Sequence, residues 1–199
     1  LGYNYASTLS EMNAASTDKP LLGLFNGSHL SYELDRVKNA GSTEPSLSDM
    51  TTKAIDVLSQ KEKGFFLMVE GGRIDHALHD TNAKRALQDT IAFDTAIKTA
   101  IDKMKVLDPE LKNTLIVVTA DHDHTLVLNG YAKRTGKTTD SEAGVLGVVK
   151  NYAGNSVGQP ATDANSMPYS IIGFGNGSNR VDGPRTAIDD AMTSADDYR

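Results

Sequence analysis

The chain of 199 residues contains no cysteine. This absence excludes disulfide bonds, thiolate metal ligands and a cysteine nucleophile. No apolar run approaches the roughly 20 residues that a transmembrane helix needs. An excess of basic residues is also lacking, because 20 lysines and arginines face 26 aspartates and glutamates, for a formal net charge of −6. This balance argues against a nucleic-acid binder that is held by phosphate contacts.

The N-terminus carries neither an initiator methionine nor the basic and apolar regions of a signal peptide. The composition is that of a globular protein, with 39% hydrophobic and 23% charged residues. A chain of this length is long enough for one domain with a sizeable core.

Short apolar runs alternate with amphipathic helix patterns along the first two thirds of the chain. Buried strands are predicted over residues 21–25, 65–69 and 114–119, and helices over residues 48–60 and 82–105. Ser46 and Asp49 indicate a capping box at the first helix. Asp94 lies within the apolar stripe of the second, either buried or, as we prefer, at its edge. The alternation predicts an α/β fold with a mostly parallel central sheet flanked by helices.

The composition of the sequence changes after about residue 130, where glycine, serine, threonine, asparagine and aspartate become frequent. Residues 1–130 are therefore predicted to be part of an α/β core. Residues 131–199 are predicted to form a loop-rich insertion or subdomain, with strand-like stretches at 144–149 and 169–174.

Four of the five histidines lie in two short stretches, residues 70–80 and 120–124. Each stretch follows a predicted buried strand, and sites in parallel sheets form beyond the carboxyl ends of the strands. Imidazoles and carboxylates are the zinc ligands that remain when thiolates are absent. The two stretches together therefore favour a metal site.

Particular spacings support this interpretation. Asp75 and His79 are i and i+4 and would share one face if a helical turn begins near residue 74. Asp121 and His122 are adjacent just past a strand, and Glu70 leaves the other strand directly. Two ligand sets on neighbouring strands suggest two or more ions, which suits phosphoryl transfer. The alternative for each motif alone is ordinary: a solvated ion pair, or a histidine with satisfied hydrogen bonds.

The run from residue 65 to residue 79, followed by Thr-Ala-Asp-His-Asp-His at 119–124, resembles the two metal-binding segments of alkaline phosphatases. The resemblance extends over about residues 18–130. It implies hydrolysis of phosphate monoesters through a phosphoserine, with Zn²⁺ and Mg²⁺ as cofactors. It also implies a homodimer, a periplasmic or secreted location, and a crown-like subdomain over residues 131–199.

The resemblance also implies a role for each matching residue. Glu70 would bind magnesium, Asp75 and His79 the first zinc, and Asp121 and His122 the second zinc; His76 would lie beside the phosphate and His124 next to the metal ligands. Arg73 is not at the position of the family's phosphate-binding arginine and receives no role.

Other parts of the family pattern have no match in this sequence. The chain lacks an Asp-Ser-Ala motif for the nucleophile, a further bridging aspartate, a hydroxyl ligand for magnesium, and a third zinc-binding histidine before Gly-Glu-Asp. Ser141 follows an aspartate, but it comes after the metal motifs rather than before them. We therefore expect an internal or C-terminal-half segment of the enzyme, incomplete for catalysis.

Two alternatives stay open from the sequence. One is another hydrolase of the same superfamily, such as a phosphodiesterase or sulfatase relative, although a glutamate at position 70 favours the phosphatase. The other is a non-catalytic metal-binding module, which the absence of the nucleophile motif supports.

Overall fold

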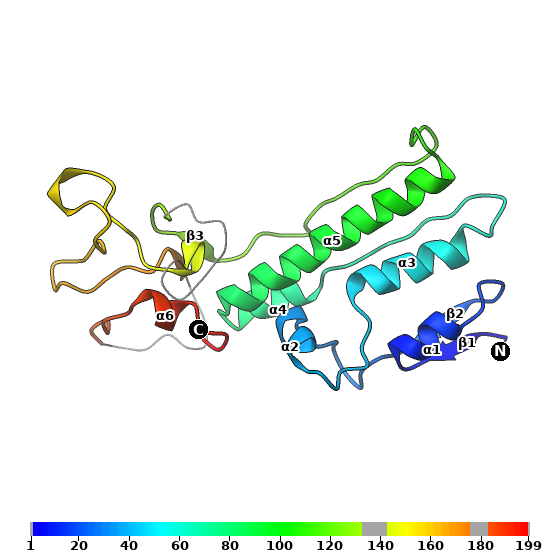
Figure 1. The fold of residues 1–199 in the computed structure, drawn as a ribbon, viewed down its shortest axis with the longest axis horizontal. Helices are drawn as coiled ribbons and strands as arrows, with labels where there is room; N and C mark the ends of the chain where they lie inside the picture. The colour runs from blue at the N-terminus through cyan, green and yellow to red at the C-terminus, as the bar shows by residue number, and fades with distance from the viewer. Residues whose placement is uncertain (1, 133–142, 176–182, 199) are drawn as a thin grey trace. The chain divides into compact units, whose positions relative to one another are not determined.

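The computed structural model describes residues 2–132, 143–175 and 183–198 (Figure 1). Its helices and strands follow in chain order: β1 (Asn4–Ala6), α1 (Leu9–Ala14), β2 (Leu21–Gly23), α2 (Glu33–Lys38), α3 (Leu47–Leu58), α4 (Arg73–His79), α5 (Ala83–Leu107), β3 (Leu126–Leu128), β4 (Ile172–Phe174) and α6 (Asp190–Thr193). Short 3₁₀ helices span Gly144–Leu146 and Gly154–Ser156.

The chain forms two compact units. The first comprises residues 1–74 and 87–121, and the second comprises residues 75–86 and 122–199. The predicted division into an α/β core over 1–130 and a crown-like subdomain over 131–199 stays a prediction, because it divides the chain by family resemblance and composition rather than by contacts.

A two-stranded parallel sheet lies at the start of the first unit. β1 pairs with β2 in the register Asn4 to Leu21, which confirms a strand within the predicted range 21–25. The side chains of Met12 and Ile55 pack between α1 and α3 and are each 2% exposed. The buried Lys53 ammonium donates to the main-chain oxygens of Asn13 and Ala15 at the end of α1, where the helix dipole favours a cation.

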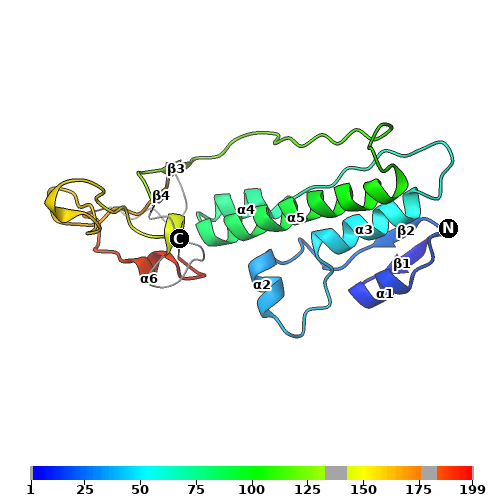
Figure 2. The ribbon, with the colours of Figure 1, turned by 45° about the horizontal axis from the view of Figure 1, so that its top comes forward.

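The two predicted long helices are present with shifted ends. α3 begins after the expected capping box: the Asp49 N–H donates to Ser46 Oγ over 3.1 Å, and the Ser46 N–H donates to the Asp49 carboxylate over 2.9 Å. α5 runs beside α3 in the first unit (Figure 2), and an ion pair joins Lys103 to Asp56 across the two helices. Asp94 is exposed, in agreement with a place at the edge of the stripe.

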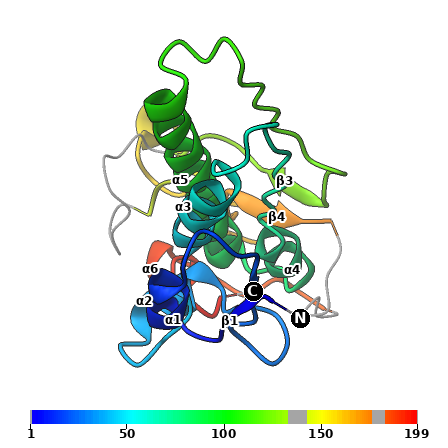
Figure 3. The ribbon, with the colours of Figure 1, turned by 90° about the vertical axis from the view of Figure 1, so that its right-hand side faces the viewer.

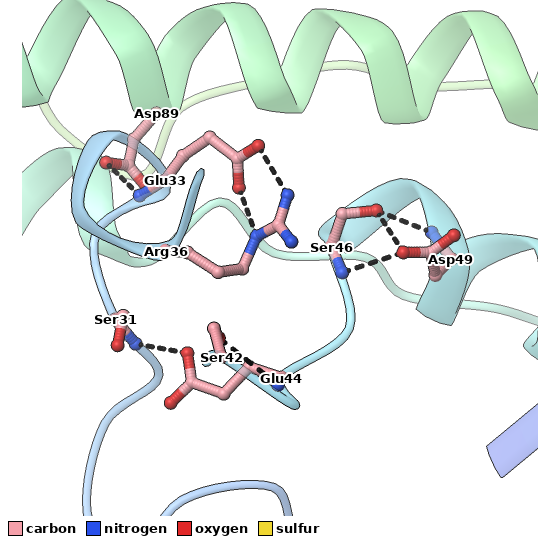
Figure 4. A network of polar contacts seen from close by, with 8 residues as sticks. All are labelled: Ser31, Glu33, Arg36, Ser42, Glu44, Ser46, Asp49 and Asp89. Atoms are coloured by element: carbon pink, nitrogen blue, oxygen red, sulfur yellow. Dashed lines mark hydrogen bonds and ion pairs between the residues drawn. The ribbon is translucent and has the colours of Figure 1, made fainter. Parts of the chain in front are cut away.

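A polar network holds α2 and the loop before α3 in the first unit (Figure 4). Glu33 receives two hydrogen bonds of 2.8 Å from Arg36. The main-chain N–H of Glu33 donates to the carboxylate of Asp89 on α5, at 3.2 and 3.3 Å. Burial raises the pKa of Glu44, but hydrogen bonds from the Asn26 amide and the Ser31 N–H outweigh this effect and lower it overall.

The second unit contains an antiparallel pair of strands, β3 and β4, with Leu126 opposite Phe174 (Figure 3). Its small core includes Leu146, Val148 and Ile171. The strand predicted over 169–174 is confirmed in its second half. The strand predicted over 144–149 is wrong in its first half, where the chain forms a 3₁₀ turn after Gly144, whose φ is +60°. Val148 then makes an isolated bridge to Ser170.

Two predicted buried strands are wrong as buried strands. Residues 65–69 and 114–119 form neither a helix nor a strand that pairs with any of the described residues. Phe66 is 89% exposed and Leu115 is 88% exposed. A strand is buried on both faces when neighbouring strands and covering helices surround it. The described residues do not provide neighbouring strands or covering helices of this kind for either run.

Candidate metal centre

The helix that follows the Gly71–Gly72 turn carries the first predicted ligand pair. α4 spans Arg73–His79, as the i, i+4 spacing requires, and Nε2 of His79 lies 3.5 Å from Oδ1 of Asp75. Because residues four apart on a helix lie one turn above each other, the carboxylate and the imidazole face the same side. The predicted helical turn is thus present.

Two further imidazoles come from the segment that leads into β3. Nε2 of His122 lies 3.8 Å from Oδ1 of Asp75, and Nε2 of His124 lies 4.0 Å from it. Ligand atoms of Asp75, His79 and His124 all lie within 4.8 Å of one another. The rings of His79 and His124 meet edge to face, with centroids 4.8 Å apart. One carboxylate oxygen therefore faces three imidazole nitrogens.

The oxygen at the centre of this cluster has no ordinary partner. Oδ1 of Asp75 is buried and accepts no hydrogen bond from the described residues. An unsatisfied buried carboxylate oxygen is costly unless a cation neutralises it. Ligands about 2.0–2.1 Å from a tetrahedral zinc ion lie roughly 3.3 Å apart. The separations of 3.5–4.0 Å from Oδ1 of Asp75 and the limit of 4.8 Å for the whole group are wider than this, but the histidine-carboxylate donor set is one that binds zinc.

His122 is held in a form that can bind a metal. Its Nδ1 lies 2.7 Å from the main-chain oxygen of Asp123. Because a carbonyl oxygen can only accept, Nδ1 must carry the proton. In the neutral ring the lone pair is then on Nε2, the nitrogen that faces Asp75.

Exposure differs strongly around the cluster. The His124 side chain is 13% exposed, whereas those of His79 and His122 are 68% and 55% exposed. The cluster is therefore closed on the side of His124 and open on the side of His79 and His122. An open side of this kind is a requirement for a catalytic ion, which must reach a substrate or water.

The remaining predicted residues lie on both units. His76 is half-buried on α4, next to Asp75. Glu70 and Asp121 are exposed and belong to the first unit. The Glu70 carboxylate folds over Gly72, where a Cβ would come 3.0 Å from Oε1. The parts of these three residues in metal or phosphate binding stay predictions.

Comparison with known proteins places the chain in a family. The sequence profile of the alkaline phosphatases matches residues 1–198. The chain belongs to the alkaline phosphatase family. It is 43% identical over 179 residues to a membrane-bound alkaline phosphatase of Bombyx mori, and 40% identical over 157 residues to the tissue-nonspecific alkaline phosphatase of Homo sapiens.

These matches cover 89% and 79% of this chain, but 28% and 25% of the two alkaline phosphatases. The chain thus spans about a quarter of the length of these relatives. Among solved structures, it is similar to a cold-active alkaline phosphatase of a psychrophilic Shewanella species, with a TM-score of 0.55 and 30% identity. That match covers 72% of this chain and 35% of the solved one, and it supports the predicted α/β fold.

Sequence reasoning placed His124 beside the metal ligands and not among them. The structure brings a ring nitrogen of His124 within 4.8 Å of the ligand atoms of Asp75 and His79. In an extended segment residues i and i+2 point to the same side, and His122 and His124 follow this spacing. A part of His124 in metal binding stays a prediction. Ser141 lies outside the described residues, so the weak Asp-Ser motif has no structural description.

Proposed function

We propose that this chain provides metal ligands to an alkaline phosphatase that hydrolyses phosphate monoesters with Zn²⁺ and Mg²⁺. The observation that carries the proposal is the buried Asp75 oxygen, which faces three imidazoles and has no hydrogen bond. Membership of the family supplies the reaction class, and the donor set is compatible with zinc.

The proposed roles follow the family resemblance. Asp75 and His79 bind the first zinc, Asp121 and His122 bind the second, and Glu70 binds magnesium. His124 lies against His79 and packs the closed side of the site. It is either a further ligand or the residue that orients His79. His76, one residue after Asp75, contacts the phosphate.

Bound zinc supplies two chemical effects, since it polarises a phosphoryl oxygen and lowers the pKa of a bound water. The protein residues then have distinct tasks. The Asp123 carbonyl fixes the tautomer of His122, and α4 holds Asp75 and His79 at one spacing. The exposed side of the cluster admits a substrate as polar as a phosphate monoester.

The proposal extends to the partner and the location. We propose that the intact enzyme is a homodimer and that it is periplasmic or secreted, as the family resemblance implies. One similar protein, from Bombyx mori, is named as membrane-bound. Among the described residues, none of the helices has the length and apolar character needed to cross a bilayer.

The metal site is tested by zinc titration of the chain in a calorimeter. Asp75→Asn should weaken zinc binding at least 100-fold, because it removes the charge and one ligand oxygen. Asp94→Asn, the same chemical change on an exposed part of α5, should leave the affinity unchanged. Absence of zinc uptake by the unaltered chain, or equal affinity of the Asp75 variant, would refute the site.

The reaction is tested separately, on the protein encoded by the complete reading frame that contains these residues. It should hydrolyse p-nitrophenyl phosphate, lose activity to a chelator, and lose it with Asp75→Asn. The isolated 199-residue chain should bind zinc and show no turnover, since no Asp-Ser-Ala nucleophile motif occurs in it. Turnover by the isolated chain would contradict that expectation.

A non-catalytic metal-binding module is the second candidate function, and the missing nucleophile motif is the observation that favours it. Zinc uptake by the chain together with an inactive full-length protein would favour this candidate. Hydrolysis of a phosphodiester or a sulfate ester in place of the monoester would favour the superfamily relatives.

A further inference from the structure

The junction between α4 and α5 is built around one buried amide side chain. Asn82 is fully buried and lies between the end of α4 at His79 and the start of α5 at Ala83. The main-chain N–H of Asn82 donates to the Ala77 carbonyl over 2.9 Å, and the main-chain N–H of Thr81 donates to the Leu78 carbonyl over 3.1 Å. This pair of bonds is a Schellman motif, which ends α4.

The same asparagine begins the next helix. Its side-chain oxygen accepts the N–H of Arg85 over 3.0 Å, the geometry of an N-cap. Two helices therefore share one residue, with no freely rotating linker between them. The direction of α4, and with it the positions of Asp75 and His79, depends on how Asn82 is held.

A segment 114 residues further along the chain holds it. The side-chain amide of Asn82 donates to the Asp196 carbonyl over 2.9 Å. Lys84 reinforces this contact, because its ammonium lies 2.7 Å from the Ser194 carbonyl and 2.7 Å from the Asp196 carboxylate. Thr193 and Ser194 are themselves buried. Residues 194–196 are thus joined to the start of α5 by two hydrogen bonds and an ion pair.

We infer that Asn82, clamped by residues 194–196, is a positioning residue for the metal ligands Asp75 and His79 of α4. The inference rests on the proposed metal site. It adds to that proposal a role for residues 194–196, which follow α6 and hold Asn82. The hydrogen bonds that hold Asn82 go to Ala77, Arg85 and Asp196, so we expect its effect to pass through the backbone of α4. Residues that orient metal ligands in this way commonly change metal affinity 10–100-fold.

The test uses Asn82→Ser, which retains an oxygen to cap α5 but is too short to reach Asp196. Zinc affinity should fall about tenfold, and the d–d absorption of the Co²⁺-loaded chain should change in position and intensity. Lys84→Met, which removes the second tether and leaves the cap intact, should lower the zinc affinity less, by about threefold.

Ser46→Ala is the control for a loss of stability away from α4, because it removes the helix cap of α3 in the first unit. It should lower the melting temperature without altering zinc affinity or the Co²⁺ spectrum. If both junction variants lower the melting temperature but keep the affinity and the spectrum, the junction is merely structural and the inference is wrong. If the unaltered chain takes up neither metal, the proposed site fails first and the inference falls with it. If Asn82→Ser does not fold, Lys84→Met decides.

Discussion

Asp89 is a carboxylate in a place that disfavours its charge. It is half-buried on α5, and burial raises its pKa to about 6. The main-chain N–H of Glu33 opposes this shift by a hydrogen bond, while the negative charges of Glu33 and Asp35 add to it. The positive charge of Arg73 acts in the opposite direction. We predict that Asp89→Asn stabilises the fold at neutral and alkaline pH.

The magnitude follows from the pKa. A rise from 3.8 to about 6 corresponds to about 3 kcal/mol at 1.36 kcal/mol per unit, and partial exposure reduces this to about 1 kcal/mol. Because the folded state binds the proton more tightly than the unfolded state, the carboxylate destabilises the fold above pH 6. This penalty disappears as the pH falls from 6 towards 3.8. Asparagine retains an oxygen for the Glu33 N–H and carries no charge.

The assay is urea unfolding of the original chain and the Asp89→Asn variant at several pH values between 4 and 8. The variant should be more stable by about 1 kcal/mol at pH 8, and its advantage should shrink towards zero near pH 4. Asp94→Asn, an exposed change on the same helix, should show no such pH dependence. A loss of stability of the Asp89 variant at pH 8, or a difference that is constant with pH, would refute the reasoning.

Three further predictions concern stability and are checked by thermal melting, where 1 kcal/mol corresponds to about 2–4 °C in a chain of this size. Thr81→Gly should stabilise by about 1 kcal/mol, because Thr81 has a φ of +54° and a buried hydroxyl without a hydrogen-bond partner among the described residues. Gly147→Ala should destabilise by about 1–3 kcal/mol, because its Cβ would lie 2.5 Å from Oδ1 of Asp190. Ser46→Ala should cost about 1 kcal/mol, because it removes the oxygen that caps the Asp49 N–H.

Opposite signs would contradict each of these expectations. A lower melting temperature for Thr81→Gly would show that the hydroxyl has a partner in solution. An unchanged value for Gly147→Ala would show that Asp190 moves at little cost, although it also receives hydrogen bonds from the Val148 N–H and the Lys150 ammonium.

The shared face of Asp75 and His79 could be predicted because its signals are local. Asp75 and His79 come to the same face within one helical turn. The two glycines at 71 and 72 favour a tight turn of the chain before that helix. The capping box of Ser46 and Asp49 is equally local. In contrast, the contact of Asn82 with Asp196 joins residues 114 apart, and no pattern within either segment indicates it.

The predicted strands show what a local pattern cannot determine. Five apolar residues in succession at 65–69 predict a buried strand, but strand pairing and burial depend on neighbours that the run itself does not specify. Thr81 illustrates a different failure. A β-branched residue disfavours the left-handed backbone conformation, yet Thr81 has a φ of +54° just after the end of α4. The local preference of threonine therefore does not predict this conformation. Contacts of the surrounding residues maintain this conformation.

The uncovered segments 65–69 and 114–118 have a consequence for the chain in solution. Both are largely apolar, uncharged and free of proline, and most of their large side chains are exposed. Unpaired N–H and C=O groups along such segments are templates for intermolecular strand addition. Two chains that meet through them gain main-chain hydrogen bonds and bury phenylalanine, leucine and valine together. Self-association through these segments should therefore increase as the concentration rises, and a molecular chaperone that binds short apolar peptides would have two binding segments in the first unit.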